Sequence, residues 1–178
     1  LREATAVKRT YPTSTYQGER VLRLGDREVR LSTAQGDASD TTVIRLPRER
    51  IVAVGDVVVH PMIWDANRYD MSSWLESLRE LERMDVAMIL PGHGPLLRDK
   101  SYVALSIELL ETIRNQVQSA LRSGAVAPDE AVAALSLGAL RDRIARLGPG
   151  AAEEFDAYAP EVARKFYQEL RDGMISKR

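Results

Sequence analysis

The segment Pro91-Gly92-His93-Gly94-Pro95 constrains the fold of this chain more than any other stretch of its 178 residues. It directly follows the apolar run from Val86 to Leu90, whose length is typical of a buried strand, so a histidine stands at the end of that strand. The glycines beside His93 allow a sharp turn and a close approach of the backbone to a ligand. Upstream, the apolar run from Ile51 to Val54 ends in Gly55-Asp56 in the same manner. A carboxylate and an imidazole delivered from two strand ends are suitable ligands for a metal site with oxygen and nitrogen donors.

Taken singly, each of these signals has an ordinary structural explanation. A lone histidine after a strand is more often a hydrogen-bonded structural residue, and Gly-Asp is a common turn. The order of the signals is more specific, because a helical pattern with Trp74, Leu78 and Leu81 on one face lies between them. The stretch from Asp40 to Lys100 resembles the second half of the metallo-β-lactamase superfamily. There, a strand pair ending in Asp, a helix carrying Trp and Leu, and a strand ending in Pro-Gly-His-Gly follow one another.

The resemblance implies a zinc site of one or two ions. Asp56 resembles the family's bridging metal ligand. A carboxylate suits this role, because it can span two cations and offset their repulsion. His93 resembles the last histidine ligand, on the second metal. Where the family usually has Gly-His-Thr, this chain has Gly36-Asp37, so Asp37 falls nearest the absent histidine, with Asp40 as the alternative. Asp37 either binds metal through oxygen, which favours a harder divalent ion or a weaker zinc site, or marks a first-metal site that has been lost.

The resemblance covers only half of the family's fold. The family's hallmark is a His-x-His-x-Asp-His segment in its first half, whereas His60 and His93 are the only histidines here. The chain therefore resembles the second half of an αββα sandwich, with the first half absent.

The function that the resemblance implies is part of a metal-dependent hydrolase. In such an enzyme, metal-activated water attacks an ester, amide, thioester or phosphoester of a small-molecule substrate. This chain alone is expected to be inactive, because residues outside it must complete the site. The alternative is a non-catalytic binding or scaffold protein that keeps the fold with a degenerate, metal-free site, since a fold by itself does not establish chemistry.

The segment from His60 to Trp64 follows Asp56 and is expected to border the mouth of the substrate pocket. His60 is a candidate substrate contact or supporting group, and Trp64 is a candidate apolar wall. His60 could equally be a loop histidine with no role, and Trp64 could only anchor its loop. The functional and the structural interpretation of these two residues both stay open.

The remaining patterns predict an α/β fold with a helical C-terminal extension. Alternating apolar residues around Gly25-Asp26 predict a β-hairpin over 21–31, and residues 42–46 and 50–54 predict a second strand pair. With strand 86–90 these segments are expected to build one mixed sheet, covered on one face by helices 70–83 and 99–121. We expect residues 1–124 to form the C-terminal half of a metallo-β-lactamase-like domain. Residues 125–178 are expected to be helices packed on it, the last over about 160–170.

The other face of the sheet is expected to need a partner. The resemblance implies such a face, with apolar surface supplied by Val43, Ile51, Ala53, Val57 and Val59. Left uncovered, it would exceed the apolar patches usual on monomers. The partner is either the missing N-terminal half or a second copy of this chain, through self-association.

Composition excludes several other classes of function. The 25 basic and 26 acidic residues nearly cancel, so charge predicts attraction neither to nucleic acid nor to a membrane. No window approaches the roughly 18 uninterrupted apolar residues of a membrane span. The absence of cysteine excludes disulfides and thiolate metal ligands. The sequence begins at Leu1 without a signal pattern, and any export signal is expected upstream, so localisation stays open between cytoplasmic and exported.

Overall fold

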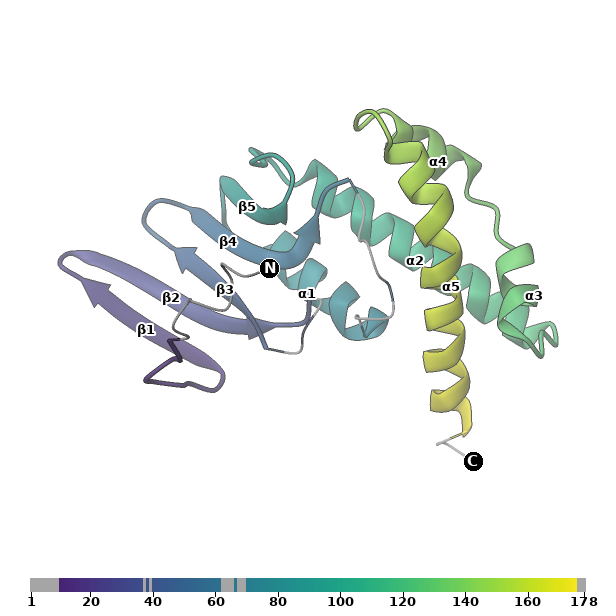
Figure 1. Cartoon of the computed structure of the whole chain (residues 1–178), viewed down its shortest axis with the longest axis horizontal. Coiled ribbons are helices and arrows are strands. Elements are labelled where there is room, and N and C mark those ends of the chain that lie inside the picture. The colour runs from purple at the N-terminus through teal and green to yellow at the C-terminus, as the bar shows by residue number, and fades with distance from the viewer. Residues whose placement is uncertain (1–9, 37, 39, 62–65, 67–69, 176–178) are drawn as a thin grey trace, which may run out of the picture.

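Five strands form one mixed sheet in the computed structural model, which describes residues 10–36, 38, 40–61, 66 and 70–175 (Figure 1). The strands lie side by side in chain order: β1 (Glu19–Leu24), β2 (Arg27–Ala34), β3 (Thr41–Leu46), β4 (Ile51–Val59) and β5 (Met88–His93). The first three pairings are antiparallel, and β4 and β5 are parallel. The expected mixed sheet is therefore confirmed.

Short turns explain why consecutive strands become neighbours in this sheet. Between β1 and β2, Gly25 adopts a φ of 64°, which a residue without a Cβ reaches at no steric cost. The expected hairpin and the second strand pair are both present. Parallel strands need a longer crossover, and helix α1 (Met71–Arg83) supplies it between β4 and β5. Strand β5 begins at Met88 rather than Val86 and continues through His93, which pairs with Val59 inside the ladder.

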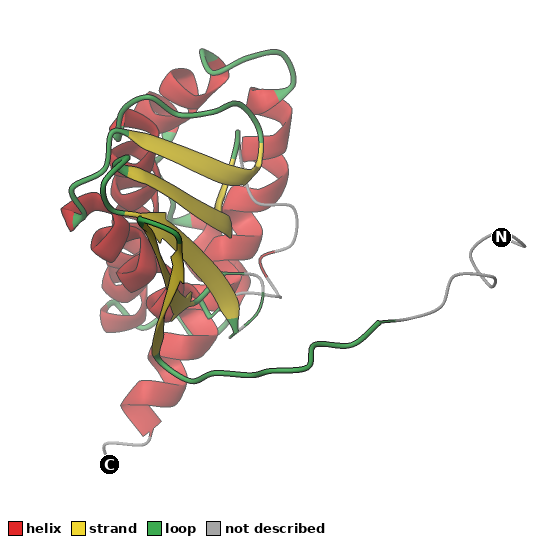
Figure 2. Cartoon of the chain, turned by 90° about the vertical axis from the view of Figure 1, so that its left-hand side faces the viewer, coloured by secondary structure: helices red, strands yellow, loops and turns green. Residues whose placement is uncertain are grey.

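Helices α1 and α2 (Ser101–Arg122) cover one face of the sheet (Figure 2). Asp70 caps α1, because its carboxylate accepts a hydrogen bond of 2.7 Å from the Ser73 backbone N–H. Asp99 likewise accepts a 2.8 Å hydrogen bond from the Ser101 backbone N–H at the start of α2. The apolar stripes expected on both helices are buried in a single core with the sheet. The 3.6-residue period thus accounts for both helices, and the cap at Asp70 adds to the start of α1.

Three further helices follow in the described part of the chain: α3 (Pro128–Ala133), α4 (Gly138–Ala145) and α5 (Ala151–Ile175). Helices α3 and α5 pack against α2, and α4 packs against α5. The C-terminal part is therefore helical, as expected. Within the described residues, no helix combines the length and the apolar character needed to cross a membrane.

Helix α5 starts nine residues before the expected start at Pro160, and that expectation was wrong. A proline is favoured in the first turn of a helix, which made it look like a start signal. Inside a helix it removes one hydrogen bond and costs about 3 kcal/mol. That cost is offset by tertiary packing, because Phe155, Ala159 and Val162 on both sides of the proline are buried.

Helix α5 also supports the start of α1 directly. The Glu169 carboxylate accepts hydrogen bonds from the backbone N–H of Met71 at 2.7 Å and of Ser72 at 3.1 Å. It accepts a third, of 2.9 Å, from the Ser72 hydroxyl. Together with Asp70, this residue satisfies the first backbone donors of α1, which no partner inside the helix can satisfy.

The face of the sheet opposite the helices carries a row of apolar side chains that the described residues leave partly exposed. Directly paired residues share a face, so Leu31, Ile44, Ala53 and Leu90 form a row across β2 to β5. In this row Ile44 is 41% exposed and Leu90 is 39% exposed. An apolar face of the expected kind therefore exists.

The residues named for this face were only partly right. Ile51 and Ala53 lie on it, whereas Val43 points to the helices and is buried. Val57 and Val59 are also buried, as is Val58 between them, so the end of β4 beyond the irregular register around Gly55 is covered on both faces. A bulge locally disrupts the ladder, and simple alternation fails beyond it.

Candidate metal centre at the carboxyl edge of the sheet

The parallel pairing of β4 and β5 brings Asp56 and His93 to the same edge of the sheet. The Asp56 Oδ1 and His93 Nε2 atoms lie 3.6 Å apart. Both side chains are partly accessible, at 29% exposed for Asp56 and 42% for His93. The strands β4 and β5 are parallel, so their carboxyl ends lie at the same edge of the sheet. Helix α1, which connects the two strands, packs on a face of the sheet and leaves this edge free of the crossover.

Gly92 makes this close approach possible. A Cβ atom at Gly92 would stand 2.0 Å from Asp56 Oδ1 and 2.7 Å from the Gly55 carbonyl carbon. No side chain fits between these atoms, so the strand carrying His93 can lie this close to Asp56 only with glycine at this position. The sequence signal of glycines around the histidine thus has a direct steric reason.

The loop that follows β2 also packs on Asp56. A Cβ at Gly36 would lie 3.0 Å from both the Asp56 carbonyl carbon and the Val57 nitrogen. Asp37, the expected third ligand, falls outside the described residues. Its alternative, Asp40, is exposed immediately before β3.

His60, the second histidine, stands at the end of β4 beside the turn that carries His93. Its backbone N–H donates to the His93 carbonyl oxygen at 3.2 Å, and a Cβ at Gly94 would lie 2.6 Å from its own Cβ. Burial lowers the pKa of the His60 imidazole below its usual value, while the negative charge of Glu154 partly opposes this. Trp64, the other residue expected at the pocket mouth, falls outside the described residues.

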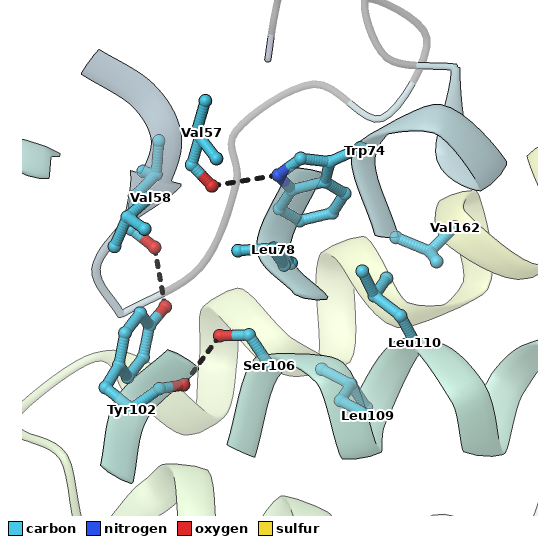
Figure 3. A pocket seen from close by; sticks show the side chains of 10 residues that line it. Val57, Val58, Trp74, Leu78, Tyr102, Ser106, Leu109, Leu110 and Val162 are labelled. Atoms are coloured by element: carbon cyan, nitrogen blue, oxygen red, sulfur yellow. Dashed lines mark hydrogen bonds between the residues drawn. The ribbon is translucent and has the colours of Figure 1, made fainter. Parts of the chain in front are cut away.

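Beneath the site, aromatic side chains from the helices hold the end of β4 (Figure 3). The Trp74 indole Nε1–H donates to the Val57 carbonyl at 2.9 Å, and the Tyr102 hydroxyl reaches the backbone at the end of the strand. Between them lies an apolar cavity of about 20 Å³, which has room for one water molecule. It is too small and enclosed to be a substrate pocket.

Sequence reasoning missed Tyr102 and Glu154, which both act on the surroundings of His60. Tyr102 lies at the start of α2 and Glu154 in the first turn of α5. Their sequence neighbourhoods are typical of an ordinary helix start. No local pattern relates either residue to a strand end more than 40 positions away.

The pair of Asp56 and His93 fits a shared metal ion in spacing and in donor type. Two tetrahedral zinc ligands with bonds of about 2.0–2.2 Å stand about 3.4 Å apart, close to the 3.6 Å separation of these atoms. Within the described part of the chain, no group of three or more His, Cys, Asp or Glu side chains converges on one point. The described residues therefore offer two ligands of a candidate centre.

The model of the metallo-beta-lactamase superfamily matches residues 6–93. No curated protein gives a significant match.

Several solved structures share the fold at low sequence identity. A stereoselective inverting sec-alkylsulfatase from Pseudomonas sp. is 13% identical with a TM-score of 0.61, over 87% of this chain and 26% of its own. A metallo-beta-lactamase family protein from Thermus thermophilus is 16% identical with a TM-score of 0.56, over 92% of this chain and 50% of its own. A metallo-beta-lactamase from Pontibacter korlensis is 21% identical with a TM-score of 0.51, over 62% of this chain and 54% of its own. The chain thus spans about a quarter to a half of the length of these structures.

Proposed function

The chain belongs to the metallo-β-lactamase superfamily, and on this basis we propose that it supplies the second half of a metal-dependent hydrolase. Asp56 and His93 are the two metal ligands that it contributes. The observation that carries the proposal is the 3.6 Å separation of Asp56 Oδ1 and His93 Nε2 across two parallel strands. An acceptor oxygen and an imidazole nitrogen at this distance match the ligand chemistry of zinc.

Each residue of the site has a distinct part in this proposal. Asp56 has two carboxylate oxygens and can bridge neighbouring cations, whereas His93 offers one nitrogen lone pair. When bound, the metal would activate water and stabilise the developing negative charge on an ester, amide, thioester or phosphoester. His60 lies beside His93, and its lowered pKa favours the neutral imidazole at the rim of the site.

The site needs further ligands to be catalytic. A catalytic zinc typically has three protein ligands and an open position, so two are insufficient. Asp37 is our proposed third ligand from this chain. The others would come from a His-x-His-x-Asp-His segment in a companion half, which this sequence lacks.

The apolar face of the sheet opposite the helices is where we propose that this companion half packs. Its apolar row crosses four strands, and such a face normally meets a second sheet about 10 Å away. Packing there would bring the second set of ligands to the edge that holds Asp56 and His93. Self-association of identical chains through the same face is the alternative.

Zinc titration by calorimetry and a hydrolysis panel test the proposal. We expect weak zinc binding and negligible turnover of esters or lactams by residues 1–178, with binding reduced further in Asp56→Asn and His93→Gln. Addition of the polypeptide encoded directly upstream should tighten zinc binding and produce turnover. Tight stoichiometric zinc and turnover by the 178 residues alone would contradict the half-protein proposal.

A second candidate function is a non-catalytic binding or scaffold protein. The feature that favours it is Gly36-Asp37, where the family usually has Gly-His-Thr, because an aspartate there weakens the preference for zinc. A metal-free and inert protein, even with its upstream half, would support this candidate.

A further inference from the structure

Tyr102 contacts the end of β4 from the helical layer. Its hydroxyl lies 2.5 Å from the Val59 carbonyl oxygen and 2.9 Å from the Pro61 carbonyl oxygen, so one O–H group is shared between two acceptors. Its ring packs on the His60 imidazole with the centroids 4.7 Å apart and the planes tilted by 49°. One side chain therefore holds three consecutive residues at the edge of the candidate metal centre (Figure 3 shows Tyr102 below this strand end).

The ladder between β4 and β5 is irregular at this strand end. The register between β4 and β5 shifts between Ala53 and Gly55 and again between Gly55 and Val59. Asp56 lies within the second irregular stretch, where regular ladder hydrogen bonds are interrupted. Contacts from outside the sheet must therefore help to fix the backbone beside this residue.

His60 transmits the contact from Tyr102 to the turn that carries His93. Its backbone N–H donates to the His93 carbonyl, and its Cβ lies where a side chain at Gly94 would collide, at 2.6 Å. A shift of His60 would therefore move the backbone directly after His93, at its carbonyl group and at Gly94. The three residues form a continuous path from α2 to the proposed ligand.

We propose that Tyr102 is a positioning residue for the candidate metal centre, holding the end of β4 and, through His60, the turn that carries His93. Its relevance to metal binding rests on the proposed function, whereas the positioning itself is a property of the metal-free chain. Tyr102 is suited to this role because burial raises the pKa of its hydroxyl well above the usual value. The hydroxyl therefore remains a hydrogen-bond donor throughout the physiological pH range.

The first test is the variant Tyr102→Phe, which keeps the ring and removes the two hydrogen bonds. The matched control is Tyr167→Phe, which removes a 3.4 Å hydrogen bond to the Ala125 carbonyl. Because the chain has only two histidines, NMR of the imidazoles reports on His60 and His93 separately. Tyr102→Phe should shift or broaden both signals, and Tyr167→Phe should leave both unchanged. Unmoved signals in a folded Tyr102→Phe variant would overturn the proposal.

A second measurement uses the unchanged chain, so it does not depend on the folding of a variant. Nuclear Overhauser contacts should join the Tyr102 ring to the His60 imidazole, and the Tyr102 hydroxyl proton should exchange slowly. If both are absent, Tyr102 does not hold the site.

Zinc affinity separates this proposal from the proposed function. Loss of a side chain that supports a metal ligand typically costs about 10–100-fold in metal affinity. We expect a loss of about tenfold for Tyr102→Phe and none for Tyr167→Phe. Moved histidine signals without any zinc binding in the parent chain would contradict the proposed function and leave the positioning intact. Equal zinc affinity in the parent and Tyr102→Phe, with unmoved signals, would contradict the positioning alone.

Discussion

Glu169 near the end of α5 should contribute more to stability than any ordinary surface carboxylate. It accepts two backbone N–H donors, of Met71 and Ser72, and the Ser72 hydroxyl at the N-terminus of α1. These backbone donors have no partner inside the helix, and the positive end of the helix dipole adds to the attraction of the carboxylate. Glu169→Ala should therefore destabilise the fold through α1, from a residue 98 positions away in sequence.

The magnitude follows from the groups involved. Loss of an N-terminal cap typically costs about 1 kcal/mol and at most about 2. Loss of a negative charge at a helix N-terminus costs about 0.3–1 kcal/mol. Because these effects overlap, we expect Glu169→Ala to lower the free energy of unfolding by about 2 kcal/mol, which corresponds to about 4–8 °C in Tm for a chain of this size. Glu169→Gln keeps a neutral acceptor oxygen and should lose about half as much.

Urea denaturation of both variants measures these changes. The control is Glu161→Ala on the same helix, since in the described part of the chain the Glu161 side chain makes no hydrogen bond or ion pair. Its effect should be within about 0.5 kcal/mol of zero. Hydrogen exchange should also accelerate at the Met71 and Ser72 amides in Glu169→Ala. If Glu169→Ala matched Glu161→Ala in stability and in exchange, the cap would have no energetic role.

Two further predictions concern the candidate centre. Gly92→Ala should displace Asp56 and destabilise the fold by about 1–3 kcal/mol, because its Cβ would stand 2.0 Å from the carboxylate; in Gly138→Ala the added Cβ meets nothing within 4 Å. Equal denaturation midpoints for these variants would contradict the steric argument. The pKa of His60, followed by NMR, should lie below the usual value of about 6.5, and Glu154→Gln should lower it further by removing a nearby negative charge. Because the fold favours the neutral form of His60, the contribution of this residue to stability should be complete above about pH 6.5. It should decline as the pH falls towards the pKa of His60 in the folded chain. A His60 pKa at the usual value in the folded protein would refute this reasoning.

Much of the sheet and the core of the site could be predicted because their signals are local. The turn at Gly25, the cap at Asp70 and the period of the α1 residues each depend on a few neighbouring positions. The approach of Asp56 and His93 could also be predicted, although they are 37 positions apart, because parallel strands joined by one helix end at the same edge. The ligand role of these two residues stays a prediction.

Local sequence patterns determined most of the strands and helices, because backbone preferences are local. The parallel direction of β4 and β5 then brings Asp56 and His93 to one edge of the sheet. Tertiary structure decided what local patterns do not encode. Beyond the irregular register around Gly55, Val57, Val58 and Val59 are all buried, so the packing at this strand end decides their exposure and alternation does not. Helix α5 continues through Pro160 because packing on both sides offsets a local cost. Tyr102 contacts the site for the same reason: only the folded chain brings the start of α2 to the end of β4.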